Sequence, residues 1–407
     1  MSARQGTTLP ALDGPADLAA PPPGGIGAAL RRPWWRLARL ARRRAAARLR
    51  ALGLVRRARP VRCRRPEGEV LFPFGKPLER GVPAREIRVP HSALAVALVR
   101  AGGVGLPFSW QRLSGAHGAV ALRLRSCDRA APARTVVKFL EMADPDDARE
   151  VRLYTSPLLR ELPPACQRPR CYGSWRTEGI TALFLEDLGP VSGLAASAYT
   201  WSPAAYRRAA WGLAHLGGAY LEAPALREPW LRPTHTPTQA RRWLVHEDWQ
   251  RGVVPDTTLW RRIQRCCSGT EALLRAFAAL PPTLCHHDAQ PSNIVLGHGR
   301  GGGLSLLDWE LTGPGPLGDD LAPLVWGSWS YSSPRALAAR ERWVLEAYLE
   351  ALAELGLSVN APLRQSVRLA YLVSSAAGYL AAMVGGGSAA VVEMVLRRWE
   401  EACSLAR

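Results

Sequence analysis

The chain has 407 residues, which suits two lobes or two domains, and 47% of its residues are apolar, so it can bury a substantial core. That apolar fraction, together with fifteen Trp, excludes a chain that is disordered throughout. The net charge of +19 is concentrated, because Arg31–Arg65 holds fifteen Arg and no acidic residue. The rest of the chain is therefore only mildly basic.

The N-terminal part of the sequence predicts an arm over residues 1–65. Residues 1–30 are rich in Pro, Gly and Ala, which is typical of disorder. Residues 31–58 combine apolar residues at helical spacing with Arg on the other sides, which predicts a basic amphipathic helix. Such a helix could contact an anionic membrane surface or a nucleic acid through residues 31–65, and a solvated tail is the alternative. Residues 66–90 are expected to form an ordered connector.

From residue 91 onward the pattern becomes regular and predicts two lobes. Residues 91–188 are expected to form a small lobe built on an antiparallel sheet, and residues 189–407 a larger, mostly helical lobe. The predicted strands of the small lobe are 108–113, 119–124, 135–140 and 183–185, and its predicted helices are 91–100 and 146–162. The predicted helices of the large lobe are 203–222, 236–250, 258–279, 334–356 and 361–384. The uncharged stretch 369–392 is long, but its Ser and Gly residues favour a buried helix with a glycine break over a membrane span.

Cysteine and lysine usage narrows the class of protein. The eight Cys include no Cys-x-x-Cys pair, which disfavours a zinc ribbon or a disulfide scaffold and indicates buried thiols in a reducing compartment. No secretory signal is evident, so we expect a cytoplasmic protein. Of 53 basic residues only Lys76 and Lys138 are Lys, and Asn293 and Asn360 are the only Asn. In a sequence that drifts toward Arg and Asp, a retained Lys or Asn indicates a chemical requirement, with chance survival as the alternative.

The sharpest motif is His-x-Asp-x-x-x-x-Asn, formed by His286, Asp288 and Asn293. Fifteen residues beyond Asn293 comes Asp308, and the two apolar runs between them flank a glycine-rich turn, which predicts an antiparallel hairpin. The residue entering the first strand of a hairpin lies beside the residue leaving the second. Asn293 and Asp308 should therefore converge, at about 5 Å, and an amide oxygen beside a carboxylate suits Mg²⁺. Asp288, in the loop before the hairpin, could orient an acceptor hydroxyl and take its proton.

This constellation resembles the aminoglycoside phosphotransferase and choline kinase superfamily of small-molecule kinases. The resemblance covers about residues 91–407 and is strongest at His286–Asn293 and Asp308–Ala322. It implies an α+β, bilobal, protein-kinase-like fold in which ATP, with GTP left open as the donor, and Mg²⁺ serve as cofactors. By this resemblance Asp288 is the catalytic base, and Asn293 and Asp308 bind the metal. His286 orders the loop, and Asp320, with Asp319 as the alternate, supports it.

The resemblance also implies nucleotide contacts in the small lobe. Lys138, a Lys among apolar residues in a strand, needs a partner, and the resemblance implies that it binds the ATP phosphates and the carboxylate of Glu150 in the following helix. A solvated surface position is the alternative for Glu150. Backbone groups of the interlobe hinge, at Glu186 and Leu188, would contact the adenine. The phosphate loop departs from the kinase pattern, because no Gly-x-Gly-x-x-Gly is present. Backbone N–H groups of the turn that holds Ser114, Gly115 and Gly118 are the candidates, and an ordinary hairpin turn is the alternative.

Several other interpretations stay open or are disfavoured. Cys285 and its His neighbours could suggest zinc, but consecutive residues point apart and no second ligand pair has metal spacing. Trp230, Trp243, Trp249 and Trp260, with acids at 247 and 248 and His246, either pack in the core or wall an acceptor pocket. Only eleven residues separate Asp308 from Asp320, which leaves no room for the activation segment of a protein kinase.

The sequence therefore predicts a phosphotransferase whose acceptor is a small-molecule hydroxyl, with no obligate protein partner. A catalytically inactive nucleotide-binding module, or a binding protein acting through the basic arm, is the alternative. Inactive relatives usually lose one of the positions equivalent to Lys138, Asp288, Asn293 and Asp308, and this chain keeps all four. The acceptor itself and the oligomeric state do not follow from the sequence.

Overall fold

The structure is a computed structural model of the whole chain. It describes residues 61–63, 69–74, 85–100, 108–113, 120–127, 134–141, 149–177, 180–189, 201–231, 233–234, 236–238, 240, 261–262, 264–265, 268–297, 302–327, 332–386 and 389–406. The amphipathic helix expected over 31–58 lies outside these residues.

The described residues fall into two compact units. The first, called the sheet unit, lies within Pro10–Glu141 and Tyr172–Asp187. The second, called the helical unit, lies within Met142–Cys171 and Leu188–Arg407. Each unit is described by itself below.

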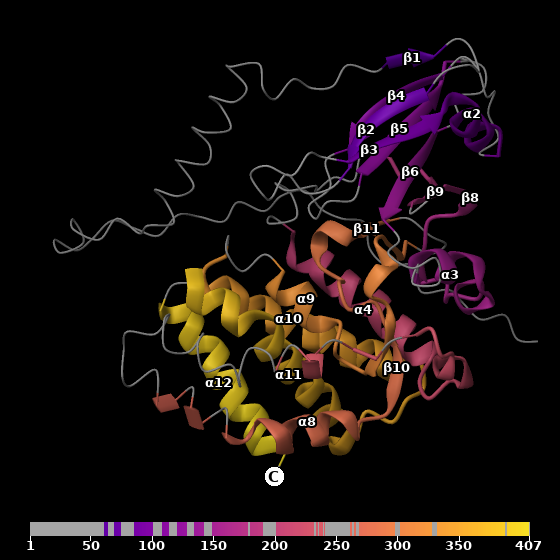
Figure 1. The fold of residues 1–407 in the computed structure, drawn as a ribbon. Helices are drawn as coiled ribbons and strands as arrows, with labels where there is room; N and C mark the ends of the chain where they lie inside the picture. The colour runs from indigo at the N-terminus through magenta and orange to yellow at the C-terminus, as the bar shows by residue number, and fades with distance from the viewer. Residues whose placement is uncertain are drawn as a thin grey trace, which may run out of the picture. The chain divides into compact units, whose positions relative to one another are not determined.

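The sheet unit is built on six strands in the order β1-β4-β5-β6-β9-β8 (Figure 1). The pairings from β1 to β9 are all antiparallel, and in β6 Lys138 lies opposite Ala121 of β5 and Leu183 of β9. The strands are β1 (Val61–Cys63), β4 (Phe108–Leu113), β5 (Val120–Ser126), β6 (Arg134–Glu141), β8 (Cys171–Thr177) and β9 (Ile180–Glu186). A separate hairpin joins β2 (Glu69–Phe74) to β3 (Arg85–Pro90) within the segment expected as a connector, and helix α2 (His91–Arg100) follows it.

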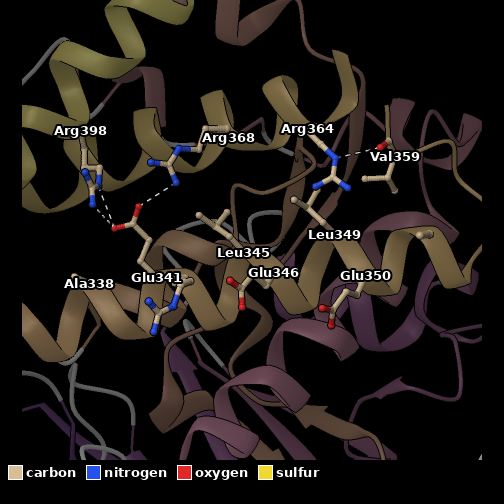
Figure 2. A pocket seen from close by; sticks show the side chains of 12 residues that line it. Ala338, Glu341, Leu345, Glu346, Leu349, Glu350, Val359, Arg364, Arg368 and Arg398 are labelled. Carbon is tan, nitrogen blue, oxygen red and sulfur yellow. Dashed lines mark hydrogen bonds and ion pairs between the residues drawn. The ribbon is translucent and has the colours of Figure 1, made fainter. Parts of the chain in front are cut away.

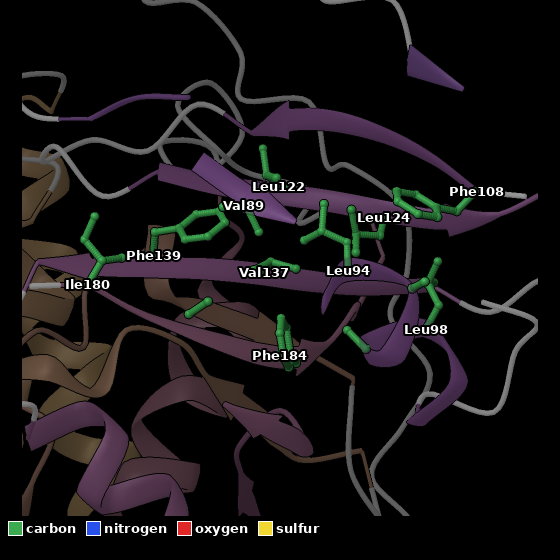
Figure 3. Close-up of a cluster of buried hydrophobic side chains, with 13 residues drawn as sticks. Val89, Leu94, Leu98, Phe108, Leu122, Leu124, Val137, Phe139, Ile180 and Phe184 are labelled. Carbon is green, nitrogen blue, oxygen red and sulfur yellow. The ribbon is translucent and has the colours of Figure 1, made fainter. Parts of the chain in front are cut away.

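The core of the sheet unit forms where one face of the sheet meets α2 (Figure 3). Val137 and Phe139 of β6 are fully buried there, as are Leu94 and Leu98 of α2. Successive side chains of a strand point to opposite faces. Lys138, between Val137 and Phe139, therefore lies on the face of the sheet opposite the α2 core.

In the helical unit, helices lie where the periodicity predicts 203–222, 334–356 and 361–384, with shifted ends (Figure 1). The predicted helix 258–279 corresponds in the described residues to a helix over Thr270–Ala278, and most of the predicted helix 236–250 lies outside them. The helices of this unit include α3 (Arg149–Thr155), α4 (Pro203–Ala219), α8 (Thr270–Ala278), α9 (Leu321–Trp326), α10 (Pro334–Glu354), α11 (Ala361–Gly386) and α12 (Ala389–Leu405). Two of them start at a Ser-Pro pair. Ser202 accepts the N–H of Ala205, and Ser333 accepts that of Ala336, so a capping hydroxyl and a Pro at the first helical position define both starts.

Two small strand groups complete the helical unit. β10 (Pro282–Cys285) pairs antiparallel with β13 (Gly313–Pro316). β11 (Ile294–Leu296) pairs with β12 (Leu304–Leu306), and β12 pairs in parallel with β7 (Cys166–Gln167). The β11–β12 hairpin confirms the prediction from the apolar runs. β7, β10 and β13 were not predicted, and β13 forms from the residues Gly-Pro-Gly-Pro.

Charged side chains join the last three long helices. Glu341 of α10 is buried, and its carboxylate pairs with Arg368 of α11 at 3.1 Å and with Arg398 of α12 at 2.7 Å. Figure 2 shows these side chains along a groove of about 590 Å³, with Leu345 and Leu349 on its apolar wall. These two guanidinium groups compensate the charge of the buried Glu341, so loss of either Arg would leave a buried charge less compensated where α10 packs on α11 and α12.

The segment 369–392 is helical over 369–386 and 389–392, and residues 387–388 lie outside the described ones. α11 runs through Gly386 and α12 begins at Ala389, with eleven successive side chains, Val367–Ala377, buried or partly buried in the unit. Among the helices that the structure describes, none combines the length and the apolar character that a membrane crossing requires.

Candidate functional site

The loop that carries the sequence motif, His286–Asn293, is called the motif loop here. It begins where β10 ends, at Cys285, which lies opposite Gly313 of β13. Leu284 and Cys285 are buried and anchor β10 in the core. Because the two strands are antiparallel, the residues that precede β13 also lie near the start of the motif loop.

The Asp320 carboxylate binds the backbone at the start of the motif loop. Its Oδ2 accepts the N–H of His286 at 2.8 Å, and its Oδ1 accepts the N–H of His287 at 2.6 Å. Burial raises the pKa of Asp320 to about 6, while the charge of His287 and the two N–H groups act in the opposite direction. Two charge-assisted hydrogen bonds to successive residues hold this part of the loop in one conformation.

Asp319, the alternate for the supporting role, contacts a different group. Its Oδ2 forms an ion pair with Nδ1 of His287 at 3.1 Å, and its Oδ1 accepts hydrogen bonds from Thr236 at 3.3 Å and from Ser374. Burial lowers the pKa of His287, but the pairing with Asp319 outweighs it and leaves the pKa above its usual value. The same pairing outweighs burial at Asp319 and lowers its pKa.

The backbone of His287 is strained. Its φ is 62°, in the left-handed region, which costs a residue with a Cβ about 1–2 kcal/mol relative to the right-handed region. Gly315 of β13 lies close to His287, and the side chains around it leave no room for a Cβ at position 315. A Cβ at 315 would lie 2.7 Å from Cε1 of His287 and 2.9 Å from Oδ2 of Asp319.

His286 lies inside the fold. Its side chain is fully buried, and its ring meets the indole of Trp309 edge-on, with centroids 5.0 Å apart. Its Nδ1 accepts the N–H of Asp288 at 3.3 Å. His286 therefore contacts the loop backbone and the segment that follows Asp308, and its contacts are those of a residue that orders the loop.

Two amide side chains donate hydrogen bonds to the carboxylate of Asp288. Asn293 donates Nδ2–H to Oδ2 of Asp288 at 2.7 Å and to its carbonyl oxygen at 2.9 Å, and Gln290 donates to Oδ1 at 3.0 Å. Both bonds from Asn293 use Nδ2. Its carbonyl oxygen, Oδ1, is therefore the atom of this side chain that is able to bind a cation.

The hairpin brings Asn293 and Asp308 to neighbouring positions. Asn293 ends the short helix that precedes β11, and its backbone carbonyl oxygen accepts the N–H of Leu307 at 2.8 Å. Asp308 follows directly, in left-handed conformation with φ 63°. The two residues predicted to converge thus sit at the same end of the β11–β12 hairpin.

Negative charge accumulates at this end of the hairpin. Burial and, after it, the nearby charge of Asp308 raise the pKa of Asp288 to about 6, against the hydrogen bonds from Gln290 and Asn293. Two carboxylates that destabilise each other's charge leave a potential that a cation would relieve. The donor set of Asn293 Oδ1 and the Asp308 carboxylate consists of hard oxygens, so these residues fit Mg²⁺.

Glu150 lies on α3, in the helical unit, and its side chain is 1% exposed. Its Oε1 accepts the backbone N–H of Trp309 at 3.3 Å. Trp309, fully buried, also donates its indole N–H to the carbonyl oxygen of Leu306 at 2.8 Å. Glu150 is therefore connected to the residue that follows Asp308. A solvated surface position, the alternative for this Glu, is excluded.

Of the remaining predicted nucleotide contacts, Lys138 and Glu186 lie in the sheet unit. Lys138 is half-buried on β6, and Glu186 ends β9 in the same unit. Near that end, the Thr135 hydroxyl donates to the carbonyl oxygen of Leu185 at 2.7 Å, and the carboxylate of Asp187 pairs with Arg123 at 2.8 Å. The segment leading to Leu188 is thus fixed to the sheet by side chains.

Other predicted positions lie beyond what the structure describes. Ser114, Gly115 and Gly118 of the phosphate-loop candidate are outside the described residues, as are Trp243, Trp249, Trp260, His246, Glu247 and Asp248 of the acceptor-pocket candidate. Trp230 is described and donates its indole N–H to Glu228 at 3.2 Å.

Sequence reasoning missed the second histidine of the motif. His287 and Cys285 were considered only as zinc ligands, and consecutive His side chains do point apart, toward Asp319 and Trp309. Ligand atoms of Cys285, His287 and Asp319 lie within 4.8 Å of one another. Burial holds the pKa of the Cys285 thiol well above its usual value, and His287 already pairs with Asp319, so both observations disfavour a metal ion at this cluster. The adjacent acids at 319 and 320 were the signal that two carboxylates support the loop.

Comparison with known proteins identifies the family. Residues 148–356, about half of the chain, match the sequence model described as the Phosphotransferase enzyme family. No curated protein matches the chain.

Solved structures of small-molecule kinases are similar to it at low sequence identity. An ethanolamine kinase from Plasmodium vivax is 16% identical with a TM-score of 0.44, and the match covers 73% of this chain and 81% of that one. A choline kinase from Streptococcus pneumoniae is 15% identical with a TM-score of 0.40, covering 73% and 92%. An aminoglycoside phosphotransferase from Streptomyces rimosus, solved with ADP and streptomycin, is 18% identical with a TM-score of 0.40, covering 70% and 99%. The chain belongs to the Phosphotransferase enzyme family, and its described residues form an α+β fold.

Proposed function

We propose that this protein transfers the γ-phosphoryl group of ATP, in a Mg²⁺-dependent reaction, to a hydroxyl group of a small molecule. The observation that carries the proposal is the pair of hydrogen bonds that Asn293 and Gln290 donate to the Asp288 carboxylate. These bonds lie at the end of the hairpin where Asp308 also lies. One end of the hairpin therefore combines a proton acceptor with a pair of hard-oxygen ligands, which is the set that phosphoryl transfer to an alcohol needs.

Asp288 is the base in this proposal. Asn293 and Gln290 leave its carboxylate oriented, and a raised pKa of about 6 keeps it mostly ionised near neutral pH while making it a better proton acceptor than a free Asp. It would hold the acceptor hydroxyl in line with the phosphoryl group and receive its proton as the new O–P bond forms and the bond to the ADP oxygen breaks.

The Asn293 amide oxygen and the Asp308 carboxylate would hold Mg²⁺. When bound, the ion supplies positive charge that stabilises the phosphate oxygens during transfer. Glu150 supports this arrangement from α3, because it binds the backbone N–H directly after Asp308. Lys138, on the sheet face opposite the α2 core, would bind the nucleotide phosphates, and backbone groups at Glu186 and Leu188 would contact the base.

The cellular setting is part of the same proposal. Cys166 and Cys285 are buried free thiols, in agreement with a reducing, cytoplasmic compartment. Contact of residues 31–65 with an anionic surface remains a prediction, since those residues lie almost wholly outside the described ones.

The test separates the metal ligand from the base. Asp308→Ala should abolish turnover and sharply weaken Mg²⁺-dependent ATP binding measured by calorimetry. Asp288→Ala should bind ATP nearly as well as the wild type while kcat falls by about 10³-fold or more. Glu271→Gln, on the exposed side of α8, is the control and should change neither quantity.

The acceptor is found by screening hydroxylated metabolites and antibiotics for ATP and GTP consumption. If Asp288→Ala loses nucleotide binding as fully as Asp308→Ala, the assignment of roles is wrong. ATP binding without turnover of any hydroxyl compound would instead support an inactive nucleotide-binding module.

A further inference from the structure

His287 has a left-handed backbone conformation that is uncommon for residues other than Gly. A residue with φ 62° is most easily Gly or Asn, and this position follows a fully buried His and precedes the proposed base. The imidazole is 5% exposed and faces Asp319, whose carboxylate is 3% exposed. A large side chain kept in a strained backbone conformation, with its charge partner equally buried, indicates that the contact itself is required.

The partner of His287 connects three separate parts of the helical unit. Asp319 lies in the turn between β13 and α9. Its second oxygen accepts hydrogen bonds from Thr236, at 3.3 Å, and from Ser374 of α11. Thr236 is in turn bonded to Thr234 at 3.0 Å, and the backbone N–H of Thr234 reaches Pro314 of β13 at 2.9 Å. The segment 234–236 leads into the part of the chain where the acceptor site is expected.

We propose that His287 and Asp319 form a buried positioning pair that fixes the motif loop to α11 and to the segment 234–236, so that the orientation of Asp288 toward the acceptor depends on it. This inference rests on the proposed function. The pair acts through the backbone, since Asp320 binds the N–H groups of His286 and His287 and the next residue is Asp288. His287 and Asp319 are therefore positioning residues, separate from the groups that touch substrates.

The charged surroundings of His287 favour the protonated form of its imidazole. Asp319 and Asp320 face it from the turn after β13, the carbonyl oxygen of Gly313 faces it from β13, and the thiol of Cys285 lies near it on β10. Tyr348 of α10 is buried beside the same carboxylates, and burial keeps its pKa well above 10, so it is neutral. Burial disfavours the charged imidazole, and the two carboxylates outweigh it.

The first test measures the pair itself. In wild-type protein, ¹H–¹⁵N spectra of the His ring nitrogens should show one imidazole that stays charged above pH 6.5, and this signal should be absent from His287→Asn. In Asp319→Asn the same ring should titrate lower. Because a raised pKa stabilises the fold fully below about pH 6.5 and progressively less as pH rises through the folded-state pKa, the Tm difference between wild type and His287→Asn should be largest near pH 5–6 and shrink at higher pH.

The second test measures positioning. His287→Asn tolerates the left-handed backbone but lacks the charge, and we expect its kcat to fall about 10- to 100-fold with ATP affinity unchanged. His287→Gly, which adopts the conformation without strain, should show the same loss and serves if the Asn variant fails to fold. His215→Asn, on α4 with its ring against Trp211, is the matched control and should keep full kcat.

The outcomes are distinguishable. If the variants lower Tm but keep the wild-type kcat per folded molecule, the pair is merely structural and the inference is overturned. It is also overturned if the ring of His287 titrates at the ordinary pH in wild-type protein. If the wild type binds no nucleotide and phosphorylates nothing, the proposed function fails, whereas the ring titration still decides whether the charged pair exists.

Discussion

At Asp288, hydrogen bonds and buried charge act in opposite directions on one carboxylate. Burial and the charge of Asp308 raise its pKa to about 6, whereas the N–H groups of Gln290 and Asn293 favour the ionised form. Gln290 contacts only one of the two oxygens and is not a proposed metal ligand. It is therefore the residue at which the pKa of the base can be changed with the rest of the site in place.

The acid limb of the pH profile should follow from this balance. Because the base must be ionised, kcat/KM for the acceptor should fall as pH drops through the pKa of Asp288, and bound Mg²⁺ should place that limb at or below pH 6. Gln290→Ala removes a hydrogen bond to the ionised form, so its limb should move to higher pH than in the wild type. Steady-state kinetics from pH 5 to 9 at saturating nucleotide measure the acid limb of the wild type and that of Gln290→Ala. Gln365→Ala, whose amide bonds the carbonyl oxygen of Leu405, is the control, and an unmoved limb in Gln290→Ala would contradict the assignment of the base.

Lys138 tests whether a rare residue marks function. A compact ammonium fits between phosphate oxygens and neighbouring side chains, while a planar guanidinium is wider and forked. Lys138→Arg keeps the charge, yet kcat/KM should fall about 10²-fold, or roughly 3 kcal/mol of transition-state stabilisation. Arg125→Lys, exposed on the neighbouring strand β5, makes the reverse exchange and should be silent. Near wild-type kinetics in Lys138→Arg would remove Lys138 from the site.

Among the elements, α4 packs so closely on the small sheet β7-β12-β11 that a glycine is required. A Cβ at Gly212 would lie 2.4 Å from Cδ2 of the fully buried Leu304 and 3.1 Å from the carbonyl oxygen of Ala165. Ala165 directly precedes β7, and its carbonyl oxygen accepts the N–H of Leu304 at 2.9 Å, so this backbone cannot yield without disturbing the pairing with β12. This close approach positions the hairpin whose other end carries Asn293 and Asp308.

Two glycine-to-alanine exchanges in helices should therefore change the free energy of unfolding in opposite directions. Gly212→Ala should lower the free energy of unfolding by about 1–3 kcal/mol, because overpacking forces strain into a filled core. Gly378→Ala, on an exposed position of α11 with open space around its Cβ, should raise it by about 0.5–1 kcal/mol through helix propensity. Denaturant unfolding of both variants measures the difference. A neutral Gly212→Ala would show that α4 can move away from the hairpin.

Over the whole molecule, the N-terminal arm and the sheet unit overlap. Strand β1 (Val61–Cys63) lies within the range 1–65 expected as an arm, and it pairs with Phe108–Trp110 of β4. Removing it would leave β4 as an unpaired edge with exposed N–H and C=O groups. The position of a truncation therefore matters by a few residues.

Two truncations should separate the arm from the strand. Deletion of residues 1–60 should leave Tm and kinase activity nearly unchanged, since none of the proposed catalytic groups lies there. Deletion of residues 1–65 should lower Tm and increase aggregation, because β4 loses its neighbour. Thermal unfolding and light scattering of the two proteins make the comparison. Equal behaviour of both truncations would show that β1 contributes nothing to the sheet.

Much of the secondary structure and the centre of the site could be predicted because they depend on neighbours in the chain. Ser202 and Ser333, each followed by Pro, set the starts of two long helices, and the apolar runs around a glycine-rich turn set the β11–β12 hairpin. The fixed spacing of Asp288 and Asn293, with Asp308 across that hairpin, brings the three proposed site residues to one end of the hairpin. Periodicity and short-range covalent geometry suffice for such features, so the sequence by itself determined them.

The hydrogen bonds and the ion pair that hold the site residues in place depend on the tertiary structure. β13 has the composition of a loop, and it forms a strand because β10 offers it a partner. Asp319 and Asp320 are adjacent in sequence, yet one binds an imidazole and the other two backbone N–H groups of a loop more than thirty residues away. The N–H that Glu150 binds belongs to Trp309, 159 residues further along the chain. Local patterns carry no information on such partners, because each contact exists only after packing has removed water from both groups and left each the other as its available partner.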